Sequence, residues 1–371
     1  MATMHVARYN YRDQFGEDPT PLMRQVSEML LAGRYILTGE VDGFESDFAA
    51  FLGVKHARGL NSGTDALTIA LRACGVTQGA EVITQANTFH ATVAAIRLCG
   101  ARPVLVDAEE RSFSLDARQL AGAITPRTRA VIPVHLYGQP APMGAILAQV
   151  RDGRIAVIED AAQAVGARID GRPVGSLGAA ACFSFHPSKN LAAAGDGGAV
   201  ATNDGDLDRQ VRLLRELGQD GQNHHVVVGL NSKLDAIQAA VLRYKLPRLP
   251  EWNARRREVA AAYRERLANL PLRFQHVEPA EEHVYHLFQV RTDRRDDLLR
   301  HVRAAGVDAV VRYPTPIHLQ PAFADLGWRK GDFPVAERLA EELLCLPIRP
   351  DLTRDEIDYV ADCVRSFFRG R

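Results

Sequence analysis

Apolar and polar residues follow two periods along the first half of the chain, one typical of helices and one typical of strands. Apolar residues at helical spacing predict helices over residues 21–32, 41–52, 66–74 and 88–99. Short apolar runs predict strands over residues 81–84, 103–107, 130–134 and 155–158. Short strands that alternate with helices indicate an α/β layer with a mostly parallel sheet.

The pattern changes beyond residue 200. Helices are predicted over residues 206–217, 232–244 and 251–267, and prolines 247 and 250 interrupt the last two. They are followed by a strand over 285–291, a helix over 296–305, a strand over 308–313 and a closing helix over 354–368. We therefore expect a large domain over residues 1–245 and a smaller α+β domain over residues 246–371. Residues 1–20 are polar and irregular, which predicts an N-terminal arm.

The composition is that of an ordinary globular protein. The 371 residues are 46% hydrophobic and 24% charged, with a formal net charge of zero. This balance argues against a nucleic-acid partner or an anionic membrane partner. No apolar run is long enough to span a membrane and no signal-peptide core precedes the first helix, so we expect a cytoplasmic protein. The five cysteines are scattered without CxxC spacing, which predicts neither a zinc site nor a disulfide framework.

Lys189 stands in a segment, residues 183–191, that has strand-like apolar residues on either side and a glycine run after it. Burial among apolar and small residues disfavours the ammonium form of a lysine and lowers its pKa. A neutral amine can attack an aldehyde and form a Schiff base. The alternative is a surface lysine in a turn, and the surrounding residues decide between the two.

Three further signals lie at the carboxyl ends of strands, where ligands gather in open α/β sheets. Asp160 ends an apolar strand and could pair with a protonated ring nitrogen, although a helix N-cap explains it more simply in isolation. Residues 61–65 open a helix, and its free N–H groups either hold a phosphate or are merely capped. Ser184 could add a hydroxyl group to the same phosphate.

A buried lysine, a carboxylate for a ring nitrogen and a phosphate seat together predict a site for pyridoxal 5′-phosphate (PLP). The glycine run at residues 195–198 lacks GxGxxG spacing and does not follow the first strand, which argues against a Rossmann dehydrogenase. No metal site is expected, because His224 and His225 are adjacent and no HExxH is present.

These motifs resemble the DegT/DnrJ/EryC1/StrS family of PLP-dependent sugar aminotransferases. The resemblance covers nearly the whole chain, and the matching segments are residues 33–39, 61–67, 134–140, 159–164, 183–189, 229–235 and 317–320. It implies the PLP-dependent transferase type I fold of aspartate aminotransferase, with a large, mostly parallel α/β domain and a smaller C-terminal α+β domain.

The resemblance also implies roles for individual residues. Lys189 would carry the cofactor covalently and then move a proton, Asp160 would pair with the pyridinium nitrogen, and Gln163 would contact the phenolic oxygen. Phe89 would stack on the pyridine ring. The residues expected around the phosphate are Gly63, Thr64, Asp65 and Ser184. Asn231 would reach the phosphate of the neighbouring subunit's cofactor, so we expect a homodimer.

The substrate side is less closely defined. His186 lies three residues before Lys189 and either lines the sugar pocket or packs beside Pro187. His318 is a candidate because it resembles the family's Pro-x-His-x-Gln element, and Tyr313 is a candidate on the strand predicted over 308–313. Two positions depart from the family pattern: lysine at position 233 where relatives usually have arginine, and arginine at position 312 where many have histidine.

The expected activity is amino transfer from L-glutamate to a nucleotide-linked keto sugar. Asp196 within the glycine run, and the residues at 231–233, look more like members that act at C3 of a dTDP-3-keto-6-deoxyhexose. The alternatives are a C4 aminotransferase acting on a 4-keto nucleotide sugar, a PLP-family dehydratase, and a PLP-binding regulatory protein without turnover. Dehydratase relatives replace the lysine by histidine, so Lys189 argues against that alternative.

Overall fold

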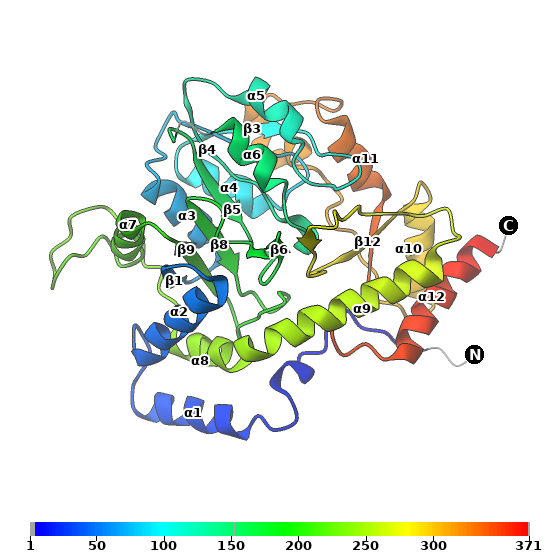
Figure 1. Cartoon of the computed structure of the whole chain (residues 1–371), viewed down its shortest axis with the longest axis horizontal. Helices are drawn as coiled ribbons and strands as arrows, with labels where there is room; N and C mark the ends of the chain where they lie inside the picture. Colours follow the sequence, from blue (N-terminus) through cyan, green and yellow to red (C-terminus); the bar gives the residue numbers. More distant parts are fainter. Residues whose placement is uncertain (1–3, 151–152, 370–371) are drawn as a thin grey trace.

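A seven-stranded sheet forms the centre of the computed structural model, which describes residues 4–150 and 153–369 (Figure 1). Its strands, in spatial order, are β1 (His56–Leu60), β9 (Gly198–Thr202), β8 (Ala180–Ser184), β5 (Ala156–Asp160), β4 (Thr128–Val131), β2 (Glu81–Gln85) and β3 (Arg102–Val106). The pairs from β8 to β3 are parallel, whereas β9 is antiparallel to both of its neighbours. The prediction of a mostly parallel α/β sheet is confirmed.

Helices cover both faces of this sheet, because its strand residues alternate between two cores. Phe183 of β8 packs with residues of α2 (Gly39–Leu52) and α8 (Ala236–Lys245). Its neighbour Cys182 packs on the opposite side, with residues of α3 (Gly63–Ala73), α4 (His90–Leu98) and α7 (Gly205–Arg215). A further cluster includes Ile146 of α6 (Met143–Gln149) and Leu120 of α5 (Leu120–Ala123), and the first helix of the chain is α1 (Thr20–Leu31).

The C-terminal part has its own three-stranded sheet, in the order β10 (Arg273–Phe274), β12 (Phe288–Arg291) and β13 (Leu343–Leu346). It packs against α9 (Leu249–Leu267), α10 (Arg295–Ala304) and α12 (Arg354–Arg369), and α11 (Pro334–Glu342) leads into β13. The α9 helix extends from the end of α8 toward this sheet (Figure 1). We propose the domain division after residue 245, because Leu249 belongs to the core around the large sheet and Val259 to the C-terminal core.

Four local predictions are corrected. The strand predicted over 308–313 is only a single bridge between Val310 and Cys345, and the Arg312 carbonyl accepts a hydrogen bond from the Tyr137 hydroxyl group rather than from a strand. The α8 helix begins at Ala236 rather than Ser232, because the Ser232 hydroxyl group bonds to Asp65.

The other two corrections concern the prolines and the N-terminal arm. Pro247 and Pro250 interrupt the α-helical pattern for only one 3-10 turn, Leu246–Arg248, because each stands in the first turn of a helical segment where no intrahelical N–H bond is lost. The α9 helix therefore begins at Leu249 rather than at Glu251. The N-terminal segment is not a free arm from residue 4 onward, because Val6 is fully buried and bridges to Val307. Residues 1–3 of the predicted arm lie outside the described residues.

Within the described part of the chain, no helix is long and apolar enough to cross a membrane. The same residues contain no cluster of three or more histidine, cysteine, aspartate or glutamate side chains arranged to hold a metal ion.

Candidate active site

A cavity of about 310 Å³ opens at the carboxyl ends of β5 and β8. It brings together side chains from segments that are far apart in the sequence, as expected for this edge of an open α/β sheet. Nine of the residues singled out from the sequence line it: Gly63, Thr64, Phe89, Asp160, Gln163, Ser184, His186, Lys189 and Tyr313. Asp65, Asn231 and His318 do not line it. A larger basin elsewhere in the molecule contains no lysine, so the site is assigned by its chemistry rather than by volume.

Lys189 lies in the loop that follows β8 and is held there by its backbone N–H group, which donates to the His186 carbonyl at 2.8 Å. The residue is partly open to the cavity but is otherwise surrounded by protein atoms. Desolvation lowers the pKa of Lys189 to about 8, and the nearby Arg312 cation adds to the effect while Asp160 opposes it. Only about a tenth of this amine is therefore unprotonated at pH 7, which is still far more than for an ordinary lysine.

Asp160 is the last residue of β5, and its buried side chain lines the cavity. Its carboxylate accepts hydrogen bonds from the Thr92 hydroxyl group at 2.8 Å and from the Ala162 N–H group at 3.2 Å. Burial raises the pKa of Asp160, although these two bonds and the Lys189 charge act against the rise. A cation held against this carboxylate would therefore be strongly stabilising.

The preceding residue, Glu159, has a structural role. It is fully buried, and its carboxylate accepts hydrogen bonds from the N–H groups of Gly175, Leu177 and Gly178. The fourth partner is the His135 ring, whose Nε2 lies 3.1 Å away. Because successive strand residues point to opposite faces, only one member of the acidic pair can reach the cavity. That member is Asp160.

The phosphate seat predicted from the sequence would lie where the start of α3 meets the end of β8. Ser62 caps the helix by accepting a hydrogen bond from the Asp65 N–H group at 3.1 Å. A Cβ atom on Gly63 would lie 2.7 Å from the Ser184 Cβ, so glycine permits this close approach. The N-terminal N–H groups of α3 and the Ser184 hydroxyl group therefore face one region of the cavity, as an anion site requires.

Phe89, Gln163 and Tyr313 form the opposite part of the cavity wall. Phe89 precedes α4 and is 48% exposed, with its ring centroid 5.3 Å from that of Tyr313. Gln163 is oriented at both ends, because its Oε1 accepts from the Tyr137 N–H group at 2.7 Å and its Nε2 donates to the Tyr313 hydroxyl oxygen at 3.0 Å. An exposed aromatic face and a fixed amide are thus presented to a bound ring.

Three residues expected at the site lie elsewhere. The Asp65 carboxylate accepts a hydrogen bond from the Ser232 hydroxyl group at 2.6 Å. Asn231 is exposed, and its Oδ1 accepts from the Lys233 ammonium group at 2.6 Å. His318 is buried, with its Nε2 2.8 Å from Glu337, so the expected contact between His318 and substrate has no support in the cavity geometry.

Comparison with known proteins identifies the family of this chain. The model of the DegT/DnrJ/EryC1/StrS aminotransferase family matches residues 19–365. The chain belongs to this family. It is thus a PLP-dependent sugar aminotransferase with the fold expected from the sequence.

Individual relatives of this aminotransferase are similar over nearly their whole length. The dTDP-3-amino-3,4,6-trideoxy-alpha-D-glucose transaminase of Streptomyces venezuelae is 46% identical, with 92% of this chain and 90% of the relative covered. The pleiotropic regulatory protein of Geobacillus stearothermophilus is 42% identical, with 99% of each chain covered. The crystal structure of S. venezuelae DesV in complex with a ketimine intermediate is 43% identical, has a TM-score of 0.96 and covers all of both chains.

The residues of the aminotransferase cavity fit PLP. Lys189 has a depressed pKa, as an amine that attacks the aldehyde requires, and Asp160 is a buried carboxylate suited to the ring nitrogen. The contact that a Cβ on Gly63 would make shows that the phosphate seat has no room for a side chain there. The exposed, flat ring of Phe89 lines the same cavity and offers an apolar face for a pyridine ring.

The sequence indicates no role for several residues of this cavity, among them Tyr9, His286 and Arg312. Arg312 was noticed only as a departure from the family pattern. Burial lowers the pKa of His286 far below its usual range, and Lys189, Arg256 and Arg312 contribute further, so His286 is neutral. Tyr9 belongs to the irregular N-terminal segment, where neither periodicity nor a motif indicates a function.

Proposed function

We propose that this aminotransferase moves an amino group from L-glutamate to the keto carbon of a nucleotide-linked sugar, C3 of a dTDP-3-keto-6-deoxyhexose. The observation that carries the reaction type is the placement of Lys189 and Asp160 in one cavity beside a phosphate seat. The substrate assignment is supported by the Streptomyces relative, which is named for a dTDP-3-amino sugar. It is also supported by Asp196, the aspartate of the glycine run, which lines the cavity.

When bound, PLP supplies an aldehyde that bonds to amines and a conjugated ring that takes up negative charge. The chain supplies the groups around it. With a pKa of about 8, the Lys189 Nζ is unprotonated in roughly a quarter of molecules at pH 7.5. It can therefore attack as an amine and later accept or return a proton at the carbon that bears the transferred nitrogen.

The other cavity residues hold and orient the cofactor. Asp160 would keep the ring nitrogen protonated, because a buried carboxylate gains most from a positively charged partner. Phe89 would cover one face of the ring, while Gln163, fixed by Tyr137 and Tyr313, would donate to the phenolic oxygen. Gly63, Thr64 and Ser184 would bind the phosphate. Asp65, which was also expected around the phosphate, does not line the cavity, because its carboxylate accepts a hydrogen bond from Ser232 and its N–H group donates to Ser62.

We further propose that His186 contacts the sugar. It is exposed and lines the cavity, and its Nδ1 accepts a hydrogen bond from the Ser188 N–H group at 3.2 Å. The Ser188 hydroxyl oxygen lies 2.9 Å from the same nitrogen. These contacts fix the ring and leave Nε2 as the nitrogen for a substrate hydroxyl group. Tyr313 is proposed for the same side of the cavity.

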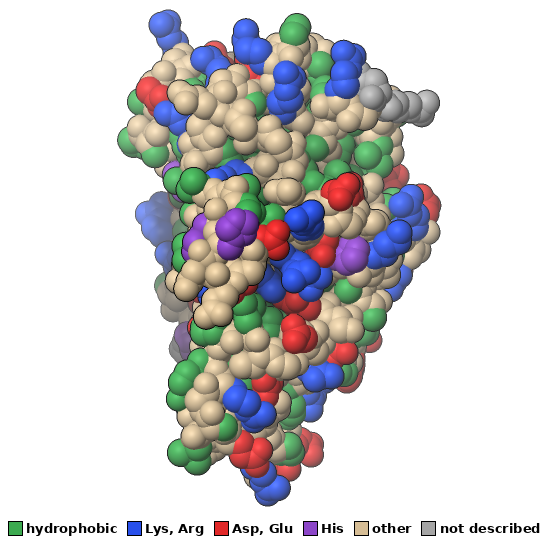
Figure 2. Space-filling model, turned by 90° about the vertical axis from the view of Figure 1, so that its left-hand side faces the viewer, with side chains coloured by type: hydrophobic (Ala, Val, Ile, Leu, Met, Phe, Trp, Pro, Cys, Tyr) green, Lys and Arg blue, Asp and Glu red, His purple; other side chains and the backbone are tan. Residues whose placement is uncertain are grey.

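We propose a homodimer as the active unit. Asn231 lies outside the cavity of its own chain, and the loop that precedes it exposes apolar side chains, with Val228 83% and Val226 45% exposed. This loop projects from the body beside α7 (Figure 1), and Figure 2 looks onto that side of the molecule. Exposed valines on a projecting loop favour burial against a second copy. There Asn231 would reach the phosphate of the neighbouring cofactor.

The test of the proposal is spectroscopic. The purified holoenzyme is treated with L-glutamate, and loss of the pyridoxal absorbance shows that the amine has been taken up. Excess glutamate is then removed, and 3-keto and 4-keto dTDP-sugars are offered separately. Recovery of the absorbance with the 3-keto sugar alone supports the proposal. Recovery with only the 4-keto sugar refutes the C3 assignment but keeps the aminotransferase.

The name of the Geobacillus relative raises a second candidate, a PLP-binding regulatory protein without turnover. Lys189, Asp160 and Gln163 all line one cavity, which favours an enzyme. The same experiment separates the two, because a protein without turnover would show no recovery of absorbance with any keto sugar.

A further inference from the structure

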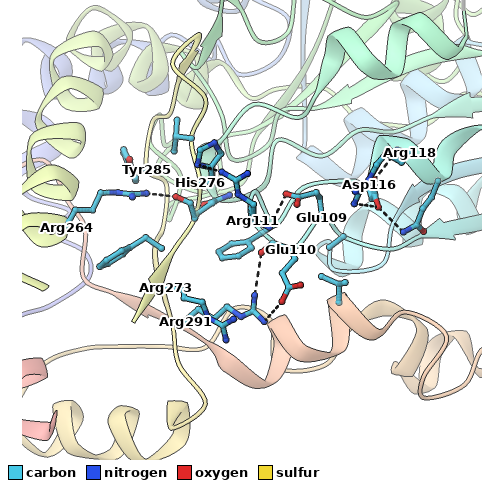
Figure 3. A pocket seen from close by; sticks show the side chains of 17 residues that line it. Glu109, Glu110, Arg111, Asp116, Arg118, Arg264, Arg273, His276, Tyr285 and Arg291 are labelled. Atoms are coloured by element: carbon cyan, nitrogen blue, oxygen red, sulfur yellow. Dashed lines mark hydrogen bonds and ion pairs between the residues drawn. The ribbon is translucent and has the colours of Figure 1, made fainter. Parts of the chain in front are cut away.

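A second cavity, of about 1060 Å³, lies between the segment that follows β3 and the segment that surrounds β10 (Figure 3). It is separate from the active-site cavity, although Tyr285 lines one and the next residue, His286, lines the other. Its wall is rich in charge. The arginines that line it are Arg111, Arg118, Arg264, Arg273 and Arg291, against three acidic residues.

The acidic residues of this basin are already occupied. Asp116 binds Arg118 through two oxygens, at 2.8 and 3.0 Å, and Glu110 pairs with Arg291 at 3.0 Å. Glu109 accepts hydrogen bonds from the backbone N–H groups of the two residues after Glu110, at 3.0 and 2.7 Å.

The arginines of the basin differ in their partners. Arg273 pairs with Glu342, at 3.1 Å, and Arg118 and Arg291 have the partners given above. Among the residues that the structure describes, the guanidinium groups of Arg111 and Arg264 have no carboxylate partner. Two guanidinium groups of the basin therefore stand outside its ion pairs, and the Glu109 carboxylate, which is bonded only to N–H and O–H groups, offsets part of their charge.

These two guanidinium groups contact the same segment, residues 274–276, from different parts of the chain. Arg264, on α9, donates to the Gln275 carbonyl at 2.5 Å and lies over the Phe274 ring, 5.3 Å from its centroid. Its Nε is buried and has no hydrogen-bond partner. Arg111 contacts the His276 ring, with its Nη2 3.2 Å from Nδ1. Figure 3 shows Arg264 approaching this segment from one side and Arg111 lying on the other side.

We propose that this basin binds a small anion that carries a diphosphate group, held between Arg111 and Arg264. A guanidinium group binds phosphate oxygens through two parallel N–H bonds, and the Arg264 guanidinium group donates to a backbone carbonyl through only one of its nitrogens. Because two guanidinium groups lack a carboxylate partner, they suit a ligand with two adjacent anionic groups better than a ligand with a single anionic group. The ligand is separate from the cofactor, whose phosphate seat lies in the other cavity.

Titration calorimetry of the PLP-saturated holoenzyme with inorganic pyrophosphate at low ionic strength tests this site. We expect at least tenfold weaker binding in Arg111→Gln and in Arg264→Gln, and no measurable binding in the double variant. Arg118→Gln is the matched control, because this arginine lines the same basin but is exposed and paired with Asp116. Its affinity should equal that of the wild type. Added salt should weaken binding to the wild type.

The outcomes are distinct. Absence of pyrophosphate binding to the wild type overturns the proposal, as does equal loss in Arg118→Gln, which would indicate a diffuse positive field. Equal affinity for malonate overturns the assignment to phosphate. Thymidine diphosphate is titrated in parallel. If its affinity depends on Arg111, the site accepts a diphosphate group carried by a nucleotide; if it does not, the site binds the free anion. Because Arg111 is exposed, its single variant keeps the test valid if the double variant does not fold.

Discussion

Replacing Lys189 by methionine should stabilise the apoenzyme while abolishing its activity. The folded state holds Lys189 at a pKa of about 8, against 10.5 for an ordinary lysine, because burial disfavours its charge. At pH 7 this lysine is protonated in both the folded and unfolded states, so folding carries the whole cost of burying the ammonium group. Methionine has a similar length and no charge, and it removes that cost.

The size of the gain follows from the pKa values. The difference between 10.5 and about 8 corresponds to about 3 kcal/mol, at roughly 1.4 kcal/mol per pH unit. This gain is an upper value, because Lys189 is partly open to the cavity. The sign follows from linkage: the unfolded state binds the proton more tightly, so the cost is fully present below pH 8 and disappears as the pH rises to 10.5.

The assay is urea unfolding of cofactor-free protein at pH 7 and at pH 10. Lys189→Met should exceed the wild type in free energy of unfolding at pH 7, and the difference should shrink markedly at pH 10. Lys189→Arg is the control, because arginine stays charged across this range and should give no stabilisation. A Lys189→Met protein that is no more stable than the wild type at pH 7 would show that burial does not depress this lysine, and the reasoning would be refuted.

Three further predictions concern the proposed roles of single residues. Borohydride reduction of the holoenzyme followed by peptide mapping should place the pyridoxyl group on Lys189, and modification of any other lysine instead would contradict the assignment. Mixed dimers of inactive Lys189→Ala and Asn231→Ala chains should regain part of the activity, because each heterodimer would hold one intact site; proven mixing without recovery would mean that each chain builds its own site. His186→Ala should reduce turnover of the keto sugar about tenfold or more while the glutamate half-reaction stays nearly unchanged, since loss of a substrate hydrogen bond acts only where the sugar is bound. Equal damage to both half-reactions would point to a structural role for His186.

Local patterns in the sequence were sufficient for most of the fold. The order of strands and helices up to residue 160 follows from apolar periodicity, and the structure confirms the parallel sheet. The failures occur where a long-range contact overrides a local pattern. Residues 308–313 look like a strand, but the carbonyl of Arg312 bonds to Tyr137, 175 positions away. The start of α8 is delayed in the same way, because Ser232 bonds to Asp65.

The residues of the candidate site also fall into two groups, those that stand in recognisable motifs and those that only the fold brings to the cavity. Lys189, Asp160, Gln163 and Ser184 stand in motifs whose spacing is visible in the sequence, and the structure places all four around one cavity. Arg312 and His286 follow no such spacing, because they enter the cavity from the C-terminal part of the chain. His318 shows the reverse: its motif resembles the family's, yet packing buries it against Glu337.

The sequence by itself determined the α/β layer, the family and the residue types that PLP chemistry needs, because these are written in short-range periodicity and in compact motifs. The family motif singles out Asp160 of the acidic pair, but only the tertiary structure decided where the neighbouring Glu159 carboxylate lies. Glu159 and Asp160 are adjacent on β5, so the pleat sends one carboxylate into a nest of backbone N–H groups and the other into the cavity. The burial that lowers the Lys189 pKa is likewise a property of packing, because it depends on atoms from segments that meet only in the folded chain.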